Sequence, residues 1–142
     1  MNTLRLVFIS SFLIFIMALV FPISAQFTAI PICTESHGQW YPAISGERIV
    51  WQDSRDGFQD DIYMYDLSNG TETPIVTESH DQKKPAIHGD YIVWEDYRNG
   101  YYSDIYLYEI STSTESTICT AVDHQRNPDI SGNIVVLSLI HI

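Results

Sequence analysis

The chain has 142 residues, with 7 basic against 18 acidic side chains and a formal net charge of −11. A surface this acidic repels phosphate backbones, which excludes nucleic acid as a natural partner. The length allows at most one ordinary domain. Aromatic residues make up 13% of the sequence and are mixed with polar ones, a composition typical of packed domains rather than of disordered chains.

The N-terminus carries one basic residue, Arg5, followed by an apolar run and a small-residue exit, "ISA", that ends at Ala25. This order of features is typical of a secretory signal peptide. The apolar run, residues 6–20, is shorter than the about 20 residues that span a bilayer. We therefore predict a signal peptide over residues 1–25 and no membrane span after its removal. The mature protein is expected outside the cell or at its surface, or in the periplasm of a Gram-negative source.

The remaining chain is an internal repeat. Successive copies begin at Pro42, Pro85 and Pro128, so the period is 43 residues and needs no gaps. The two complete copies are identical at 20 of 43 positions, which excludes coincidence. A partial copy also precedes Pro42, where "IPICTESHGQWYP" aligns with "TPIVTESHDQKKP".

Each copy is predicted to form four short strands. In the first copy, "PAI" and "RIVWQD" give the first and second strands, and "DIYMYDL" and "ETPIVT" give the third and fourth. Turn dipeptides separate them, Asp56-Gly57 before the third strand and Asn69-Gly70 before the fourth. The chemistry therefore reads as an antiparallel sheet, and no helical periodicity appears after residue 25.

Both faces of the third strand are apolar. Alternation places Ile62 and Met64 on one face, and Tyr63 and Tyr65 on the other. A sheet with one wet side would not carry apolar residues on both faces. Each sheet should therefore be packed between two neighbours.

Four-stranded antiparallel sheets, buried on both faces and repeated in tandem, describe the blades of an all-β fold, the β-propeller. The motifs "PAISGERIVWQD", "DIYMYDLSNG" and "TPIVT" resemble the TolB-like (Tol-type) propeller repeat, as it occurs in exported surface proteins of methanogenic archaea. The resemblance implies blades over residues 42–77 and 85–120 and the start of a further blade over 128–136. It also implies that residues 28–34 form a closing strand of the last blade. Such repeats serve many roles, so they assign no activity by themselves.

An immunoglobulin-like sandwich is the competing fold, because Cys33, Trp51 and Cys119 follow its Cys-Trp-Cys order. The repeat excludes it, since Trp51 has a twin in Trp94 and the two cysteines occupy equivalent positions two copies apart. Around a ring, such positions lie farther apart than the about 7 Å between Cα atoms that a disulfide permits. We therefore predict no disulfide between Cys33 and Cys119.

The last six residues, 137–142, break the repeat. Val136 aligns with Val93, so a tryptophan is expected where Leu137 stands. One back-translation of residues 137–142 matches the transposon-end adapter used in preparing sequencing libraries. We therefore expect these residues to be a sequencing-adapter artefact and the sequence to be the N-terminal fragment of a longer propeller protein. Since closed propellers typically have about 4–8 blades, an isolated fragment with an open blade face is expected to self-associate.

Two charged constellations recur in the hairpin between the second and third strands. They are Asp53, Arg55 and Asp61, and their twins Asp96, Arg98 and Asp104. Grouped carboxylates are the ligands that calcium prefers, but an arginine among them opposes a cation. We favour a structural interpretation, in which the aspartates accept hydrogen bonds in the turns and pair with arginine.

Histidines and glutamines recur in the loops that join successive copies. His37 and His80 share a repeat position, and His124 is shifted by one and aligns with Asp81. Gln39, Gln82 and Gln125 follow them. A metal or pH-sensing cluster is one interpretation. Solvated loop histidines are the interpretation we favour, because successive sheets hold these loops apart.

No catalytic motif appears: the sequence has no G-x-S-x-G elbow, no H-E-x-x-H and no phosphate-binding glycine loop. We therefore predict no catalytic, cofactor-binding or metal-binding residue. Asn69 opens an N-glycosylation sequon on a predicted exposed turn and is a candidate glycosylation site. The favoured function is a non-enzymatic exported module that binds protein or glycan at the cell surface. The alternatives are the propeller of an extracellular enzyme, either a polysaccharide lyase or a serine peptidase, and a subunit of a periplasmic envelope complex.

Overall fold

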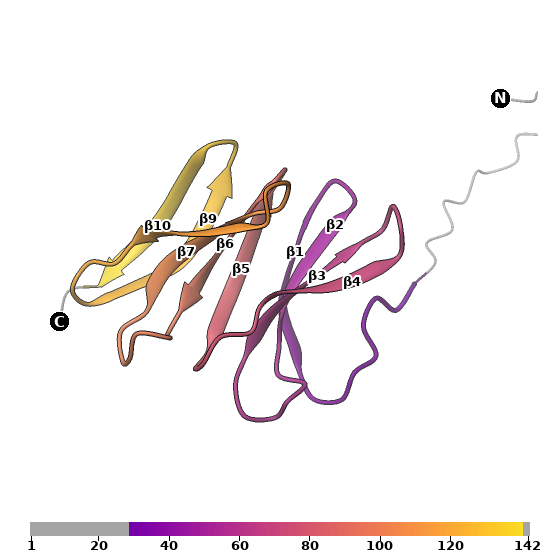
Figure 1. The fold of residues 1–142 in the computed structure, drawn as a ribbon, viewed down its shortest axis with the longest axis horizontal. Helices are drawn as coiled ribbons and strands as arrows, with labels where there is room; N and C mark the ends of the chain where they lie inside the picture. The colour runs from indigo at the N-terminus through magenta and orange to yellow at the C-terminus, as the bar shows by residue number, and fades with distance from the viewer. Residues whose placement is uncertain (1–28, 141–142) are drawn as a thin grey trace, which may run out of the picture. The chain divides into compact units, whose positions relative to one another are not determined.

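The computed structural model describes residues 29–140, and within this range the chain is all β (Figure 1). The compact unit begins at Pro31. The predicted signal peptide, residues 1–25, lies outside the described residues. None of the described residues belongs to a helix that is long and apolar enough to cross a membrane.

Antiparallel strands follow one another in chain order in every sheet. The first sheet holds β1 (Gln39–Ser45), β2 (Arg48–Asp53), β3 (Asp61–Asp66) and β4 (Thr71–Val76). The second sheet holds β5 (Gln82–His88), β6 (Tyr91–Asp96), β7 (Asp104–Glu109) and β8 (Thr114–Cys119). The third sheet holds β9 (His124–Ser131) and β10 (Ile134–Ile140). The predicted four-stranded antiparallel sheets are therefore confirmed, and each 43-residue copy gives one sheet.

The first strand of each sheet begins earlier than the "PAI" segment. β1 starts at Gln39, and its pairing with β2 shifts register between Trp40 and Ala43, where Tyr41 has a φ of 51°. Lys84 and Asn127 have φ values of 52° and 51° at the equivalent positions. This bulge directly precedes the proline, which has no N–H to donate to the ladder. The first strand therefore runs through the proline that was expected to begin it.

One hydrophobic core joins the facing sides of the first two sheets. The first sheet contributes Val50, Ile62, Met64 and Val76, and the second contributes Ile87, Ile92, Trp94 and Tyr106. Ile62 and Met64 lie on the same face of β3, as alternation predicts. The apolar face of one copy therefore packs against a different face of the next copy.

The opposite face of the second sheet is covered too. Val93 and Ile105 are fully buried, and β9 packs against β5, β6 and β7. Burial of the second sheet on both faces confirms the expectation that a sheet lies between two neighbours (Figure 1).

The two ends of the repeat region differ from the regular copies. Residues 29–34 form no strand, and residue 28 lies outside the described range. Their role as a closing strand stays a prediction. β10 continues through residues 137–140 and pairs with β9. The adapter origin of residues 137–142 also stays a prediction.

Candidate functional site

The repeated tryptophan, aspartate and arginine of the first sheet form one buried cluster. Asp53 ends β2, and its Oδ2 accepts hydrogen bonds from Trp51 Nε1 and Arg55 Nη2, both at 2.8 Å. Its Oδ1 accepts the backbone N–H of Arg55 at 2.8 Å, which fixes the turn that leaves the strand. The Arg55 guanidinium also lies 3.7 Å from the ring centre of Tyr63 and pairs with Glu72 at 2.7 Å. We call this set the Trp-Asp-Arg cluster.

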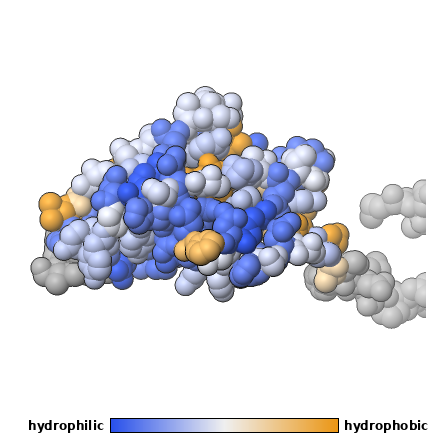
Figure 2. Space-filling model, turned by 60° about the horizontal axis from the view of Figure 1, so that its bottom comes forward, coloured by the Kyte–Doolittle hydropathy of each residue, from blue (hydrophilic) through white to orange (hydrophobic). Residues whose placement is uncertain are grey.

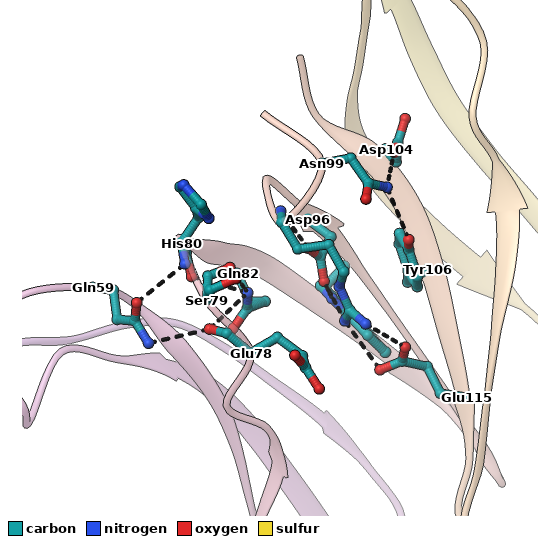
Figure 3. Close-up of polar contacts among 12 residues, drawn as sticks. Gln59, Glu78, Ser79, His80, Gln82, Asp96, Asn99, Asp104, Tyr106 and Glu115 are labelled. Carbon is teal, nitrogen blue, oxygen red and sulfur yellow. Dashed lines mark hydrogen bonds and ion pairs between the residues drawn. The ribbon is translucent and has the colours of Figure 1, made fainter. Parts of the chain in front are cut away.

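The second sheet repeats the Trp-Asp-Arg cluster. Asp96 accepts hydrogen bonds from Trp94 Nε1 at 2.8 Å and from Arg98 Nη2 at 2.6 Å. Arg98 lies 4.2 Å from the ring centre of Tyr106 and pairs with Glu115 at 2.6 Å (Figure 3). The repeat therefore preserves a complete network of five side chains and not only the three residues that the sequence singled out.

The electrostatics of the first cluster support a structural role. Although burial opposes it, hydrogen bonds from Arg55 and Trp51 lower the pKa of Asp53. The hydrogen bond to Asp53, and then that to Glu72, raise the pKa of Arg55. Both groups stay charged and paired near neutral pH, as the structural interpretation requires. Among residues 29–140, no three His, Cys, Asp or Glu side chains gather in a set that could hold a metal ion.

The last aspartate of each constellation has different surroundings in the two sheets. Asp61 is 2% exposed, and its Oδ1 has no hydrogen-bond partner among the described residues. Burial, followed by repulsion from Asp56, raises the pKa of Asp61 to about 6. At the equivalent place, Asp104 Oδ2 accepts a hydrogen bond from Asn99 Nδ2 at 2.9 Å (Figure 3). Neither aspartate is paired with the arginine that the sequence grouped with it.

Glutamine side chains fix the loops that join the sheets. Gln82 Nε2 donates to the carbonyl of His80 at 2.9 Å, and Gln125 Nε2 donates to carbonyls of the loop before it. Gln59 holds the first of these loops from the other side (Figure 3). Its Oε1 accepts the backbone N–H of His80 and its Nε2 donates to the Glu78 carbonyl, both at 3.1 Å. Gln82 and Gln125 are therefore loop ties, whereas the buried Nε2 of Gln39 has no hydrogen-bond partner among the described residues.

The recurring histidines form no common cluster. His37 and His80 are exposed and have left-handed backbones, with φ values of 73° and 67°. His124 differs, because it is only 4% exposed and its ring packs against the rings of Tyr101 and Tyr102 at 5.4 and 5.1 Å. The expectation of a solvated loop histidine is wrong for His124, since aromatic side chains from the β6–β7 connection cover it.

His124 takes the structural place of an aspartate. Its Nδ1 accepts the backbone N–H of Ser103 at 3.2 Å, and at the preceding junction Asp81 Oδ1 accepts the backbone N–H of Asp60 at 3.1 Å. The alignment of His124 with Asp81 therefore marks one position where two different side chains accept the same hydrogen bond. Each junction ties the next sheet to the hairpin of the sheet before it.

An open groove of about 700 Å³ lies where these loops meet, beside the β2–β3 and β6–β7 connections. Phe58 and Tyr101 line it from the same repeat position, and they are 96% and 77% exposed. His80, Asp81 and Arg126 are among its polar lining residues. These connections lie at the bottom of Figure 1, the side that is turned forward in Figure 2. Figure 2 shows a mostly hydrophilic surface on which apolar residues form separate patches.

Asn69 lies on the exposed turn between β3 and β4. Its Oδ1 accepts hydrogen bonds from the backbone N–H of Thr71 at 2.9 Å and from Thr71 Oγ1 at 2.6 Å. The position is open to solvent, so the sequon is sterically accessible. Glycan attachment there stays a prediction.

No protein-family model matches the chain, and no curated protein matches it significantly. Solved structures do match it. A candidate TolB from Agrobacterium tumefaciens superposes with a TM-score of 0.58 over 68% of this chain, at 19% sequence identity. TolB from Acinetobacter baumannii superposes with a TM-score of 0.54 over 69% of this chain, at 20% identity. The chain has the fold of a TolB-like β-propeller.

The three sheets of this TolB-like propeller are successive blades of an incomplete ring, and we call them the first, second and third blades. The chain spans 35% and 25% of the lengths of the two solved proteins. At this level of identity the match shows the fold alone, as expected for a repeat that serves many roles.

Sequence reasoning missed the aromatic pair and the arginine that line the groove. Phe58 and Tyr101 each follow a turn glycine and are largely exposed, although the Tyr101 ring also packs against Tyr102 and His124. The 43-residue spacing of two such aromatics was the available signal. The sequence gives no signal for Arg126, because only the fold brings β9 to the same groove.

Proposed function

We propose that this chain is an exported, non-enzymatic propeller module that binds protein or glycan at the cell surface through the groove between its first and second blades. The observation that carries the proposal is the pair of exposed aromatic side chains, Phe58 and Tyr101, at one repeat position on consecutive hairpins. Exposed aromatic residues at a concave site are typical of binding surfaces.

The repeated charged residues have a structural role, and that role supports binding by the hairpins. Asp53, Arg55 and their twins form the Trp-Asp-Arg clusters, which fix the hairpins that carry the aromatic pair. Their role is thus to hold a rigid frame, and a rigid frame that presents loops suits recognition.

A binding assay with isolated cell envelopes of the source organism tests the proposal. The full chain should bind, and the double variant Phe58→Ala/Tyr101→Ala should bind at least about tenfold more weakly, a loss of about 1.4 kcal/mol. Tyr41→Ala is the matched control, because Tyr41 is an exposed aromatic residue on β1 that does not line this groove. Equal binding by the double variant and the wild type would contradict the proposal.

A further inference from the structure

We infer that the groove takes a neutral oligosaccharide, with adjacent sugar rings stacked on Phe58 and Tyr101. The inference rests on the proposed binding function and adds the class of ligand. Five observations support it. The groove has aromatic walls, side-chain donors without partners, a fixed floor and backbone N–H groups that already donate within the protein, and the chain is strongly acidic.

The aromatic walls are suited to pyranose rings. A sugar ring presents a flat array of C–H bonds, which packs against the face of an aromatic ring, while its hydroxyl groups point outward to polar partners. Phe58 is 96% exposed, and Tyr101 is 77% exposed even though its ring packs against Tyr102 and His124, so both rings keep free area for a ligand. They belong to consecutive hairpins at one end of the blades, so a chain of sugars that reaches from one hairpin to the next would meet both.

Polar side chains in the groove have donors to spare. Arg126 makes no ion pair among the described residues, and its buried Nε has no hydrogen-bond partner there. The His80 imidazole likewise makes no hydrogen bond within the described chain, since His80 is held through its backbone. Hydroxyl groups of a sugar accept such donors, and a guanidinium offers several in one plane.

The floor of the groove is fixed before any ligand arrives. Gln59 holds the β4–β5 loop at both Glu78 and His80. Asp81 accepts from the backbone of Asp60 and pairs with Lys83 at 2.6 Å. Fixed loops lower the ordering cost of binding, which matters most for a weakly held, hydroxyl-rich ligand.

A peptide ligand fits the groove less well. Recognition of an extended peptide relies on free main-chain groups at a sheet edge. Among the residues that line this groove, the backbone N–H groups of His80, Tyr97 and Gly100 donate within the protein. A sugar makes no such demand, because its contacts are to side chains.

Charge favours a neutral sugar over an acidic one. The chain carries a formal net charge of −11, which repels polyanions at a distance. One arginine in the groove does not offset this charge.

An array of immobilised oligosaccharides tests the inference with the full chain. Neutral hexose and N-acetylhexosamine oligomers should bind, and uronate oligomers should bind at least about tenfold more weakly. Phe58→Ala and Tyr101→Ala should each reduce binding about tenfold, Tyr101→Phe should retain it, and Tyr41→Ala should leave it unchanged. Circular dichroism of each variant checks that the sheets remain intact. Binding of uronates but not of neutral oligomers, or of neither, would overturn the inference.

Treated cell envelopes separate a wrong ligand class from a wrong function. Periodate destroys sugar diols, and protease removes proteins. Binding that is lost after periodate and kept after protease supports the saccharide. Binding that is kept after periodate and lost after protease overturns the saccharide but leaves the proposed binding function standing. No binding to untreated envelopes overturns both.

Discussion

The first and second blades share one frame, but their hairpins surround the buried aspartate with different side chains. In the first blade, burial and then repulsion from Asp56 raise the pKa of Asp61 to about 6. In the second blade, Asn99 replaces Asp56 and donates a hydrogen bond to Asp104 at 2.9 Å. A repeat therefore fixes the backbone and the Trp-Asp-Arg cluster, while the neighbouring hairpin side chains set whether a buried carboxylate meets repelling charges or a hydrogen-bond donor.

Breaking the shared frame should have the largest effect. Asp96→Ala removes the carboxylate that accepts from Trp94 and Arg98, so the buried Trp94 N–H loses its acceptor and the half-buried Arg98 guanidinium keeps only its pair with Glu115. We expect a loss of about 3 kcal/mol in the free energy of unfolding, measured by urea denaturation. Glu47→Ala, at an exposed site whose side chain makes no hydrogen bond or ion pair among the described residues, should change stability by less than about 0.5 kcal/mol. A loss below about 1 kcal/mol for Asp96→Ala would show that the Trp-Asp-Arg cluster does not stabilise the blade.

The buried Asp61 carboxylate of the first blade makes the free energy of unfolding depend on pH. The pKa of Asp61 in the folded protein, about 6, lies above its ordinary value of 3.8, so the folded state binds the extra proton between these values. This contribution to stability is complete below about pH 4 and is lost as the pH rises through about 6. Asp61→Asn should therefore flatten that part of the stability profile and raise stability at pH 7 by about 2 kcal/mol.

Urea unfolding at several pH values between 4 and 8 measures the difference. The matched control is Asp104→Asn, whose carboxylate already has a donor in Asn99. A control variant with the same gain at pH 7 would mean that the two blades do not differ in this respect.

Exchanging the hairpin residues should transfer the property between blades. Asp56→Asn removes a repelling charge and supplies a donor to Asp61, so stability at pH 7 should rise by about 1 kcal/mol. Asn99→Asp should lower it by a similar amount. Thermal unfolding of both single variants and of the double exchange gives the comparison. Changes of the same sign in both single variants would contradict this account.

The smallest expected effect is that of N-glycosylation, which only the first blade can undergo at its β3–β4 turn. Asn69 carries a sequon on the β3–β4 turn of the first blade, and Thr112 stands at that position in the second. Expression through a glycosylating secretory pathway should give a mass increase that Asn69→Gln abolishes and Asn133→Gln does not. The stability of the unglycosylated Asn69→Gln protein should fall by no more than about 0.5 kcal/mol. An unchanged mass for the wild type would exclude Asn69 as an acceptor.

Much of the fold was predictable because the repeat shows the same solution twice. The period placed the third strand, and alternation assigned Ile62 and Met64 to the core face they occupy. The start of the first strand was not predictable, because the bulge at Tyr41 is a backbone feature with no signature apart from the following proline.

The candidate site was less accessible to sequence reasoning. The pairing of Asp53 with Arg55 followed from their spacing, but Glu72 joins them from β4, and only the sheet brings it near. The burial of His124 depends on tyrosines from the neighbouring hairpin, which lies 20 or more residues earlier in the chain. Local patterns describe strands and turns well, and they carry little information on which loops meet.

The junctions between blades have a consequence for how such a protein changes in evolution. Gln82 N donates to the Asp60 carbonyl at 2.6 Å, and Gln125 N donates to the Ser103 carbonyl at 2.9 Å, one period later. Each copy therefore brings a donor for the blade before it and an acceptor for the blade after it. Duplication of one 43-residue unit in the gene creates a new junction with no mismatched partner, so a lineage can change the number of blades in a single recombination event without redesigning any interface.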